Sequence, residues 1–134
     1  MKESTKKWME YAGEDLRIAQ TLNQAGVFVR GICFHSHQAV EKGLKAILAE
    51  KTGPIPRTHN LVTLHERVCG MTDVEADPDQ LDFLNSIYID SRYPFDAGLL
   101  PHGEPTRKDC LKALEYAEEI LEQVLKILRN LKNR

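Results

Sequence analysis

One group of polar side chains, between residues 35 and 45, has the types and spacing that suit binding to a phosphate. On a helix that turns by about 100° per residue, one side collects His35, Gln38, Lys42 and Lys45. Glu41 lies one turn before Lys45, so these two residues form a favourable ion pair. Two interpretations stay open: this side is a solvated charged face, or it is the wall of a cleft that presents cations and amides to a phosphate or a base.

A second group surrounds Arg92 in the segment YIDSRYPFD, residues 88–96. Arg92 lies where a helix is expected to stop, just before the rigid Tyr93-Pro94 step. A planar guanidinium binds phosphate through two parallel hydrogen bonds. It equally suits a structural salt bridge to Asp90 or Asp96 that closes the following loop, and the domain would then serve only as an interaction module.

The histidines and cysteines do not have the spacing of a metal site. His35 and His37 point about 200° apart on a helix, so they cannot bind one ion from the same side. The chain has no CxxC or HExxH pattern, no Gly-rich phosphate loop and no GxSxG turn. We therefore expect neither a metal nor a cofactor.

The composition predicts one globular domain over residues 1–134. Of these residues 42% are hydrophobic and 28% charged, and the formal charge of −2 excludes a global positive field that would attract nucleic acid. Three widely separated cysteines, Cys33, Cys69 and Cys110, are typical of free thiols in a reducing cytosol. No apolar run approaches the length of a membrane span, so we expect a cytoplasmic protein without membrane contact.

Apolar residues at helical spacing predict the elements that position these groups. The central helix, residues 28–48, is apolar over half its circumference and carries small residues at Ala39, Gly43 and Ala46. A first helix spans residues 4–23, a short third one spans residues 61–69, a fourth begins at Pro78 and the last begins at Thr106. The predicted fold is an all-α, up-and-down bundle of four long helices plus one short helix.

Two further features have consequences for the fold and the site. Asp15 lies in the apolar stripe of the first helix, where an unpaired carboxylate is costly, so we expect a Lys, Arg or His partner on the central helix. Residues 93–105 hold three prolines and two glycines. Loops of this length are usually functional or disordered.

These motifs, in their order and spacing, resemble the HEPN family (higher eukaryote and prokaryote nucleotide-binding domain). The resemblance covers nearly the whole chain. The matching pieces are Asp15-Leu16 with Ala19, Phe34-His35, residues 38–46, residues 58–61 with Leu64, residues 88–94 and the final helix from Thr106.

The resemblance implies a helical bundle that forms a homodimer and brings its sites together at the subunit interface. Many family members accompany a minimal nucleotidyltransferase, and many others are metal-independent RNases that act as toxins or in antiviral defence. We therefore expect a module that binds a nucleotide or an RNA phosphate and pairs with a nucleotidyltransferase in a toxin–antitoxin-like system. By this resemblance, the contacts come from Arg92 and from the side of the central helix that carries His35, Gln38, Lys42 and Lys45.

The alternative that the resemblance implies is a metal-independent endoribonuclease. RNase members carry an Arg followed after four to six residues by a His, whereas the next histidine after Arg92 is His102. The catalytic pair would then be Arg92 with His102, or Arg92 with His35 or His59 from the other chain. Without such a role, His59 is expected to be a structural polar residue, as is Asp15.

Overall fold

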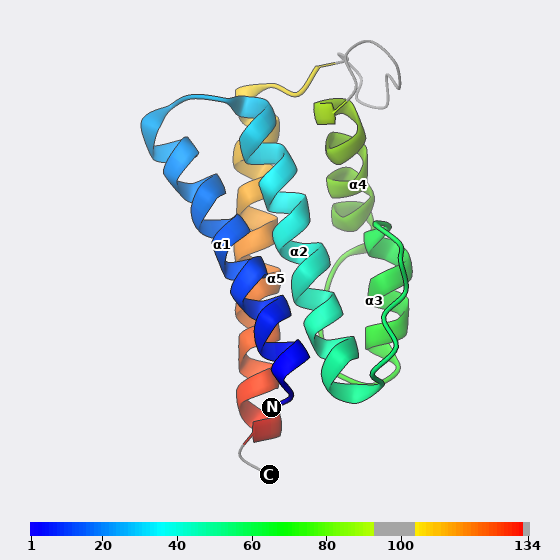
Figure 1. Cartoon of the computed structure of the whole chain (residues 1–134). Coiled ribbons are helices and arrows are strands. Elements are labelled where there is room, and N and C mark those ends of the chain that lie inside the picture. Colours follow the sequence, from blue (N-terminus) through cyan, green and yellow to red (C-terminus); the bar gives the residue numbers. More distant parts are fainter. Residues whose placement is uncertain (93–103, 133–134) are drawn as a thin grey trace.

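Five helices form an all-α bundle, as predicted. The computed structural model describes residues 1–92 and 104–132, and these contain no strand. The helices are α1 (Glu3–Ala25), α2 (Val29–Lys51), α3 (Leu61–Cys69), α4 (Pro78–Arg92) and α5 (Arg107–Lys132). Figure 1 shows α1, α2 and α5 running alongside one another, with α3 and α4 following each other along the far side of α2. No helix within the described ranges is long and apolar enough to cross a membrane.

The helix ends follow from local sequence. Gly26 ends α1 in the left-handed conformation at φ 70°, which costs glycine little. The side chain of Asn60 accepts hydrogen bonds from Val62 N and Thr63 N and so caps α3. At the start of α5, Thr106 N donates to Asp109 Oδ2 at 2.9 Å and Asp109 N donates to Thr106 Oγ1 at 3.2 Å. This reciprocal pair forms a capping box.

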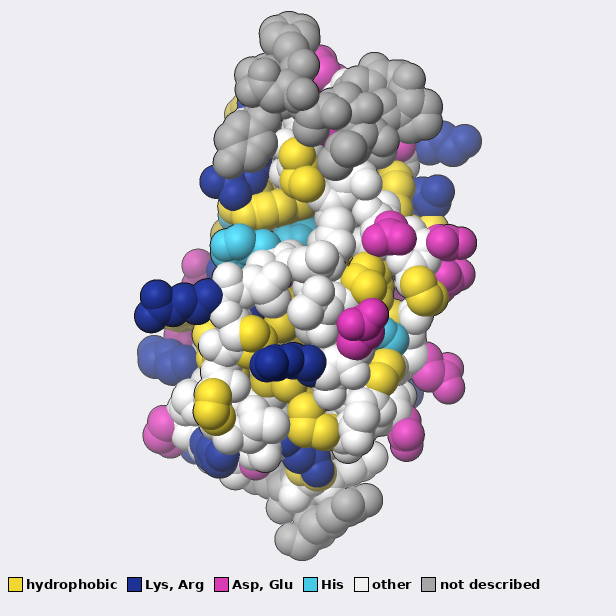
Figure 2. Space-filling model, turned by 90° about the vertical axis from the view of Figure 1, so that its right-hand side faces the viewer, with side chains coloured by type: hydrophobic (Ala, Val, Ile, Leu, Met, Phe, Trp, Pro, Cys, Tyr) yellow, Lys and Arg dark blue, Asp and Glu magenta, His cyan; other side chains and the backbone are white. Residues whose placement is uncertain are grey.

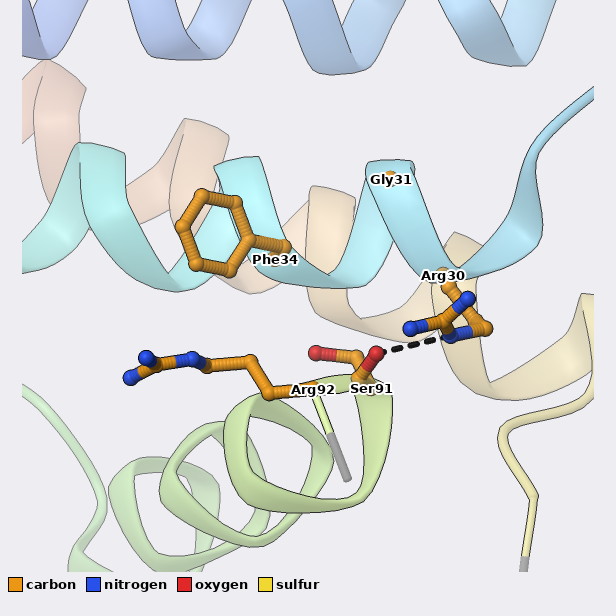
Figure 3. A pocket seen from close by; sticks show the side chains of 5 residues that line it. All are labelled: Arg30, Gly31, Phe34, Ser91 and Arg92. Atoms are coloured by element: carbon orange, nitrogen blue, oxygen red, sulfur yellow. Dashed lines mark hydrogen bonds between the residues drawn. The ribbon is translucent and has the colours of Figure 1, made fainter. Parts of the chain in front are cut away.

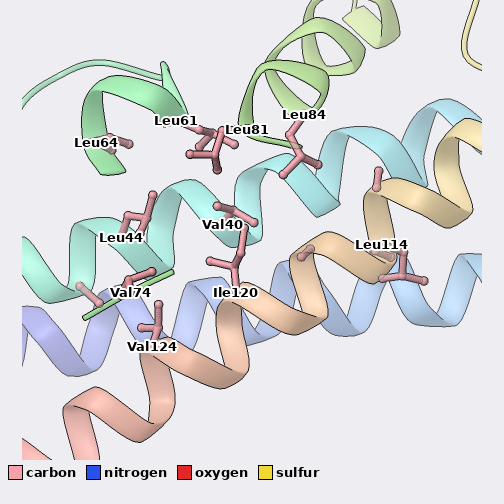
Figure 4. Close-up of a cluster of buried hydrophobic side chains, with 14 of the residues drawn as sticks. Val40, Leu44, Leu61, Leu64, Val74, Leu81, Leu84, Leu114, Ile120 and Val124 are labelled. Carbon is pink, nitrogen blue, oxygen red and sulfur yellow. The ribbon is translucent and has the colours of Figure 1, made fainter. Parts of the chain in front are cut away.

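Helix α2 is the centre of the bundle, because it contacts each of the other four helices. Val40 and Leu44 on α2 meet Ile120 and Val124 of α5 in the buried cluster drawn in Figure 4. At Gly43 a Cβ atom would come within 2.7 Å of Leu121 Cδ1, so the missing side chain lets α5 approach closely. Gly43 thus allows α2 and α5 to pack closely. Other side chains of α2 contact α1 and α4.

Candidate functional site between α2 and α4

Arg92 lies in the last turn of α4, where Tyr88 holds its guanidinium. Arg92 Nη1 donates a hydrogen bond to Tyr88 Oη at 2.6 Å, and Arg92 Cζ lies 5.2 Å from the centroid of the Tyr88 ring. The two residues are one helical turn apart, so α4 itself sets their geometry. Burial fixes Tyr88 in turn, since only 7% of that residue is exposed. Arg92 is therefore an exposed cation on a rigid support.

A first pocket beside Arg92 opens between the start of α2 and the end of α4. Its volume is about 390 Å³, and it is lined by Arg30, Gly31, Phe34, Ser91 and Arg92. Arg30 Nε donates to the carbonyl of Ser91 at 2.7 Å. In Figure 3 the two arginines extend to opposite ends of this pocket, with the Phe34 ring on the α2 side. The pocket thus combines two cations with one aromatic ring.

A second pocket continues from Arg92 along α4 and has a volume of about 340 Å³. It is lined by residues from α2, from the loop before α3 and from α4: His37, His59, Asn60, Asn85, Tyr88, Ile89 and Arg92. Among the residues that the structure describes, Arg92 is the one that lines both pockets. Figure 2, which faces the α3 and α4 side, shows histidine side chains with hydrophobic and basic side chains directly above them.

His37 forms the buried floor of the second pocket. Its ring lies 4.0 Å from the Tyr88 ring, centroid to centroid, and its Nε2 donates to Asn85 Oδ1 at 3.3 Å. Its Nδ1 then accepts from Gln38 Nε2 at 3.4 Å. Burial lowers the pKa of His37 to about 4, because the charged ring would lose its hydration. His37 is therefore neutral at pH 7 and acts as an aromatic wall.

His59 is the exposed histidine of the second pocket, and a buried carboxylate orients its ring. His59 Nδ1 lies 2.9 Å from Glu41 Oε1, and the side chain of His59 is 63% exposed. Lys45 Nζ donates to the other carboxylate oxygen, Glu41 Oε2, at 3.0 Å. In the neutral ring Nδ1–H donates to Glu41 and Nε2 is an acceptor. This arrangement suits proton transfer at Nε2.

Asp15 has the partners on α2 that the sequence predicted. Lys42 Nζ donates to Asp15 Oδ2 at 2.6 Å, and His35 Nδ1 lies 2.7 Å from Asp15 Oδ1. Asp15 is only 6% exposed, so the cluster joins α1 to α2 through a nearly buried ion pair. The prediction of a Lys, Arg or His partner for Asp15 is confirmed.

The polar side of α2 lies apart from the two pockets that Arg92 lines. Neither of the two Arg92 pockets is lined by any of its four predicted residues: His35, Gln38, Lys42 or Lys45. Lys45 lies in the interior, with a side chain 7% exposed and paired with Glu41. Lys42 is directed at Asp15 instead. The predicted pair Glu41–Lys45 does form, but its burial was not foreseen. The predicted His102 lies outside the described residues.

Several pocket residues were not predicted to line the phosphate site, although their spacing carries a signal. Arg30, Phe34 and His37 follow one another at i, i+4 and i+7 on α2. On α4, Asn85 and Tyr88 precede Arg92 at similar spacing. Each set therefore marks one helix face. Among the described residues, no group of three or more His, Cys, Asp or Glu side chains is arranged to hold a metal ion.

Comparison with known proteins identifies the family. A model of the HEPN domain matches residues 5–128. The chain belongs to the HEPN domain family. This HEPN chain has no match among curated proteins.

Two solved structures share the fold of this HEPN protein. TT1696 from Thermus thermophilus is 28% identical, with a TM-score of 0.69 over 93% of this chain and 98% of that one. ST0689, described as an archaeal HEPN homologue, is 29% identical, with a TM-score of 0.69 over 94% of this chain and 98% of that one. The family expected from the motifs is thus confirmed.

Proposed function

We propose that this HEPN domain protein binds the phosphate of a nucleotide or of RNA in the cleft between α2 and α4, with Arg92 as the main contact. The observation that carries this proposal is the position of Arg92 where two pockets adjoin. A guanidinium there offers paired donors to phosphate oxygens, while the partly exposed ring of Phe34 offers a surface for base stacking. Among the described residues, no carboxylate side chain lines either pocket.

The proposal gives the polar side of α2 a supporting role. Lys42 and His35 are engaged by Asp15, and Lys45 by Glu41. The charges of Lys42 and Lys45 are therefore largely neutralised before any ligand arrives. Gln38 acts indirectly, because its amide holds the His37 ring that floors the second pocket.

We further propose that the protein acts as a homodimer and pairs with a minimal nucleotidyltransferase in a toxin–antitoxin-like system. Support comes from the family resemblance. The net charge of −2 fits a local phosphate site and not a long nucleic-acid track. Purification of the tagged chain from its native cells, followed by mass spectrometry for a bound nucleotidyltransferase, tests the pairing, and sedimentation equilibrium tests the dimer.

Binding is tested by fluorescence anisotropy with a labelled single-stranded RNA and by competition with mononucleotides. Hydrogen bonds to a charged group contribute about 1.5–3 kcal/mol, so Arg92→Gln should weaken binding by roughly 10- to 150-fold. Arg67→Gln, which removes the same charge from an exposed position on α3, is the matched control and should change the Kd less than twofold. Equal affinities for the two variants would refute the assignment of Arg92.

A second candidate function, metal-independent RNA cleavage, is favoured by the placement of His59 in the Arg92 pocket. In this reaction the ribose 2′-hydroxyl gives its proton to His59 Nε2 and attacks the phosphorus. The bond to the 5′-oxygen then breaks, the departing 5′-oxygen takes a proton from water to become a 5′-hydroxyl, and a 2′,3′-cyclic phosphate remains. Arg92 stabilises the charge on the phosphate oxygens during this step. Glu41 would stabilise the protonated ring of His59.

Cleavage is tested with end-labelled RNA in the presence of EDTA. Activity that survives EDTA and is lost in both Arg92→Gln and His59→Gln supports this second candidate. Activity that persists in His59→Gln and is lost in His102→Gln assigns the proton transfer to His102 instead. Binding without cleavage leaves the protein as a binding module.

A further inference from the structure

We propose that two copies of this chain pair through the groove between α1 and α5, with α1 of one copy lying antiparallel against α1 of the other across Gly13. This inference rests on the proposed homodimer and specifies the face that forms it. The face is remote from the Arg92 cleft, because α2 lies between α1 and α4 (Figure 1). It differs from the arrangement that the family resemblance implies, in which the sites meet at the subunit interface.

The groove has the length and the apolar lining that suit a helix. Its volume is about 620 Å³, and the lining residues of α1 run from Lys6 to Gln20. Fourteen residues at 1.5 Å per residue correspond to about 21 Å, or four helical turns. Apolar side chains from both helices line it: Met9, Leu16, Leu121 and Leu125. Leu125 is 39% exposed, so a second helix in the groove would bury apolar surface.

Gly13 lies at the midpoint of this stretch of α1, and packing within the chain does not require a glycine there. A Cβ atom at Gly13 would meet no atom within 4 Å, whereas a Cβ atom at Gly43 would collide with Leu121. Glycine also weakens the interior of a helix. A second helix that crosses at Gly13 would use the missing side chain for a close approach of the two backbones.

The charges beside Gly13 match those of a second, antiparallel α1. Glu10 and Arg17 both line the groove, three residues before Gly13 and four residues after it. A twofold axis at Gly13 therefore places Glu10 of each copy beside Arg17 of the other, which gives two symmetric ion pairs. Arg17 has no ion-pair partner in the part of the chain that the structure describes, and Glu10 has only an exposed pair with Lys7 at 3.5 Å. A parallel pairing would set like charges against each other.

The same pairing provides a partner for the acidic edge that Glu118 and Glu122 form on α5. Residue 6 lies as far before Gly13 as residue 20 lies after it, so Lys6 of one copy is level with Gln20 of the other. Gln20 Nε2 donates to Glu118 Oε2 at 3.2 Å. Lys6 of the second copy would thus lie beside Glu118. Within one chain Lys6 pairs with Glu3 at 3.2 Å, where both side chains are exposed and the pair is weak.

Sedimentation equilibrium of the full chain tests this inference by measuring the Kd of the dimer. Glu10→Arg and Arg17→Glu each turn two attractions into two repulsions, so each should raise this Kd roughly tenfold. Gly13→Leu has room within its own chain but blocks the second helix, and it should raise the Kd by at least as much. Glu66→Arg makes the same charge change at an exposed position on α3 and is the matched control, which should shift the Kd less than twofold.

A mixture of two variants tests the antiparallel pairing directly. In an equimolar mixture of Glu10→Arg and Arg17→Glu, position 10 of each chain faces a position 17 of opposite charge. The two chains should therefore form a heterodimer with a Kd close to that of the wild-type dimer, although each variant alone dimerises weakly. Absence of this recovery would refute the pairing, and circular dichroism of each variant verifies its folding.

The outcomes separate this inference from the homodimer on which it rests. If the wild-type chain stays monomeric, the homodimer fails and this inference fails with it. If the wild-type chain dimerises and none of the three α1 variants changes the Kd, the homodimer stands and this face is refuted. Gly13→Leu should keep the RNA affinity of the wild-type protein. Loss of RNA binding together with the dimer would show that the phosphate site needs the interface, which refutes a face remote from the cleft.

Discussion

Acidification should destabilise the protein through His37, the buried histidine beneath Tyr88. Burial lowers the pKa of His37 to about 4 in the folded chain, from an ordinary value of 6.5. The unfolded chain thus binds a proton at a higher pH than the folded chain does. The contribution of His37 is fully present above pH 6.5 and is lost as the pH falls from 6.5 towards 4.

The magnitude follows from these two pKa values. Between about pH 7.5 and pH 5.0 the linkage relation gives a loss of about 2 kcal/mol from His37 alone. Urea denaturation followed by circular dichroism measures the free energy of unfolding at both pH values. Histidine side chains in general titrate in this range, and the chain has five of them, so the quantity of interest is the difference between the wild-type protein and His37→Gln, which cannot bind the proton.

The wild-type protein should lose about 2 kcal/mol more than His37→Gln between the two pH values. His65→Gln is the control, because His65 lies on α3 and the contribution of His37 remains in that variant. It should lose as much stability as the wild-type protein does. If His37→Gln shows the same loss as the wild-type protein, the folded state accepts a proton on His37, and the neutral floor of the second pocket is refuted.

Two other predictions concern buried groups. Asp15→Ala leaves the ammonium of Lys42 unpaired in a largely buried setting; breaking a fully buried pair costs about 3–5 kcal/mol, and partial exposure of Lys42 reduces this to about 2 kcal/mol. The melting temperature should fall by roughly 4–10 °C, and an unchanged value would contradict the burial of the pair. Iodoacetamide should label the exposed Cys69 in the native protein, whereas buried Cys33, with a pKa raised to about 12 by burial, should react only after unfolding. Peptide mass mapping identifies the labelled thiol, and labelling of native Cys33 would contradict its burial.

The fold could be predicted from the sequence because its determinants are local. Gly26, Asn60 and the Thr106–Asp109 box act on residues within one helical turn, and the helices that they end or begin lie within a few residues of the predicted bounds. Asp15 was also predictable, since its place in an apolar stripe demands a partner whatever the topology. For such residues, periodicity and capping rules are sufficient.

The composition of the site depends on which helix faces meet, and this is not a local property. Lys45 has the sequence context of a surface lysine, yet α1 covers it, and its ammonium lies 5.5 Å from the Trp8 ring. Phe34 and Tyr88 are 54 positions apart in the sequence and stack only because α4 packs against α2. The periodicity of the sequence predicts which face of each helix is apolar. It does not predict which faces of two helices pack against each other.

The same packing links the stability of the bundle to the geometry of Arg92. Tyr88 contacts His37 on the buried side of the cleft and accepts a hydrogen bond from Arg92 on the exposed side. The position of the Arg92 guanidinium is therefore set by the Tyr88 ring, which packs between α2 and α4. Arg92 is the last residue of α4, and its side chain is anchored one turn back within the same helix. This explains how a residue at a helix end can offer a fixed cation to two pockets at once.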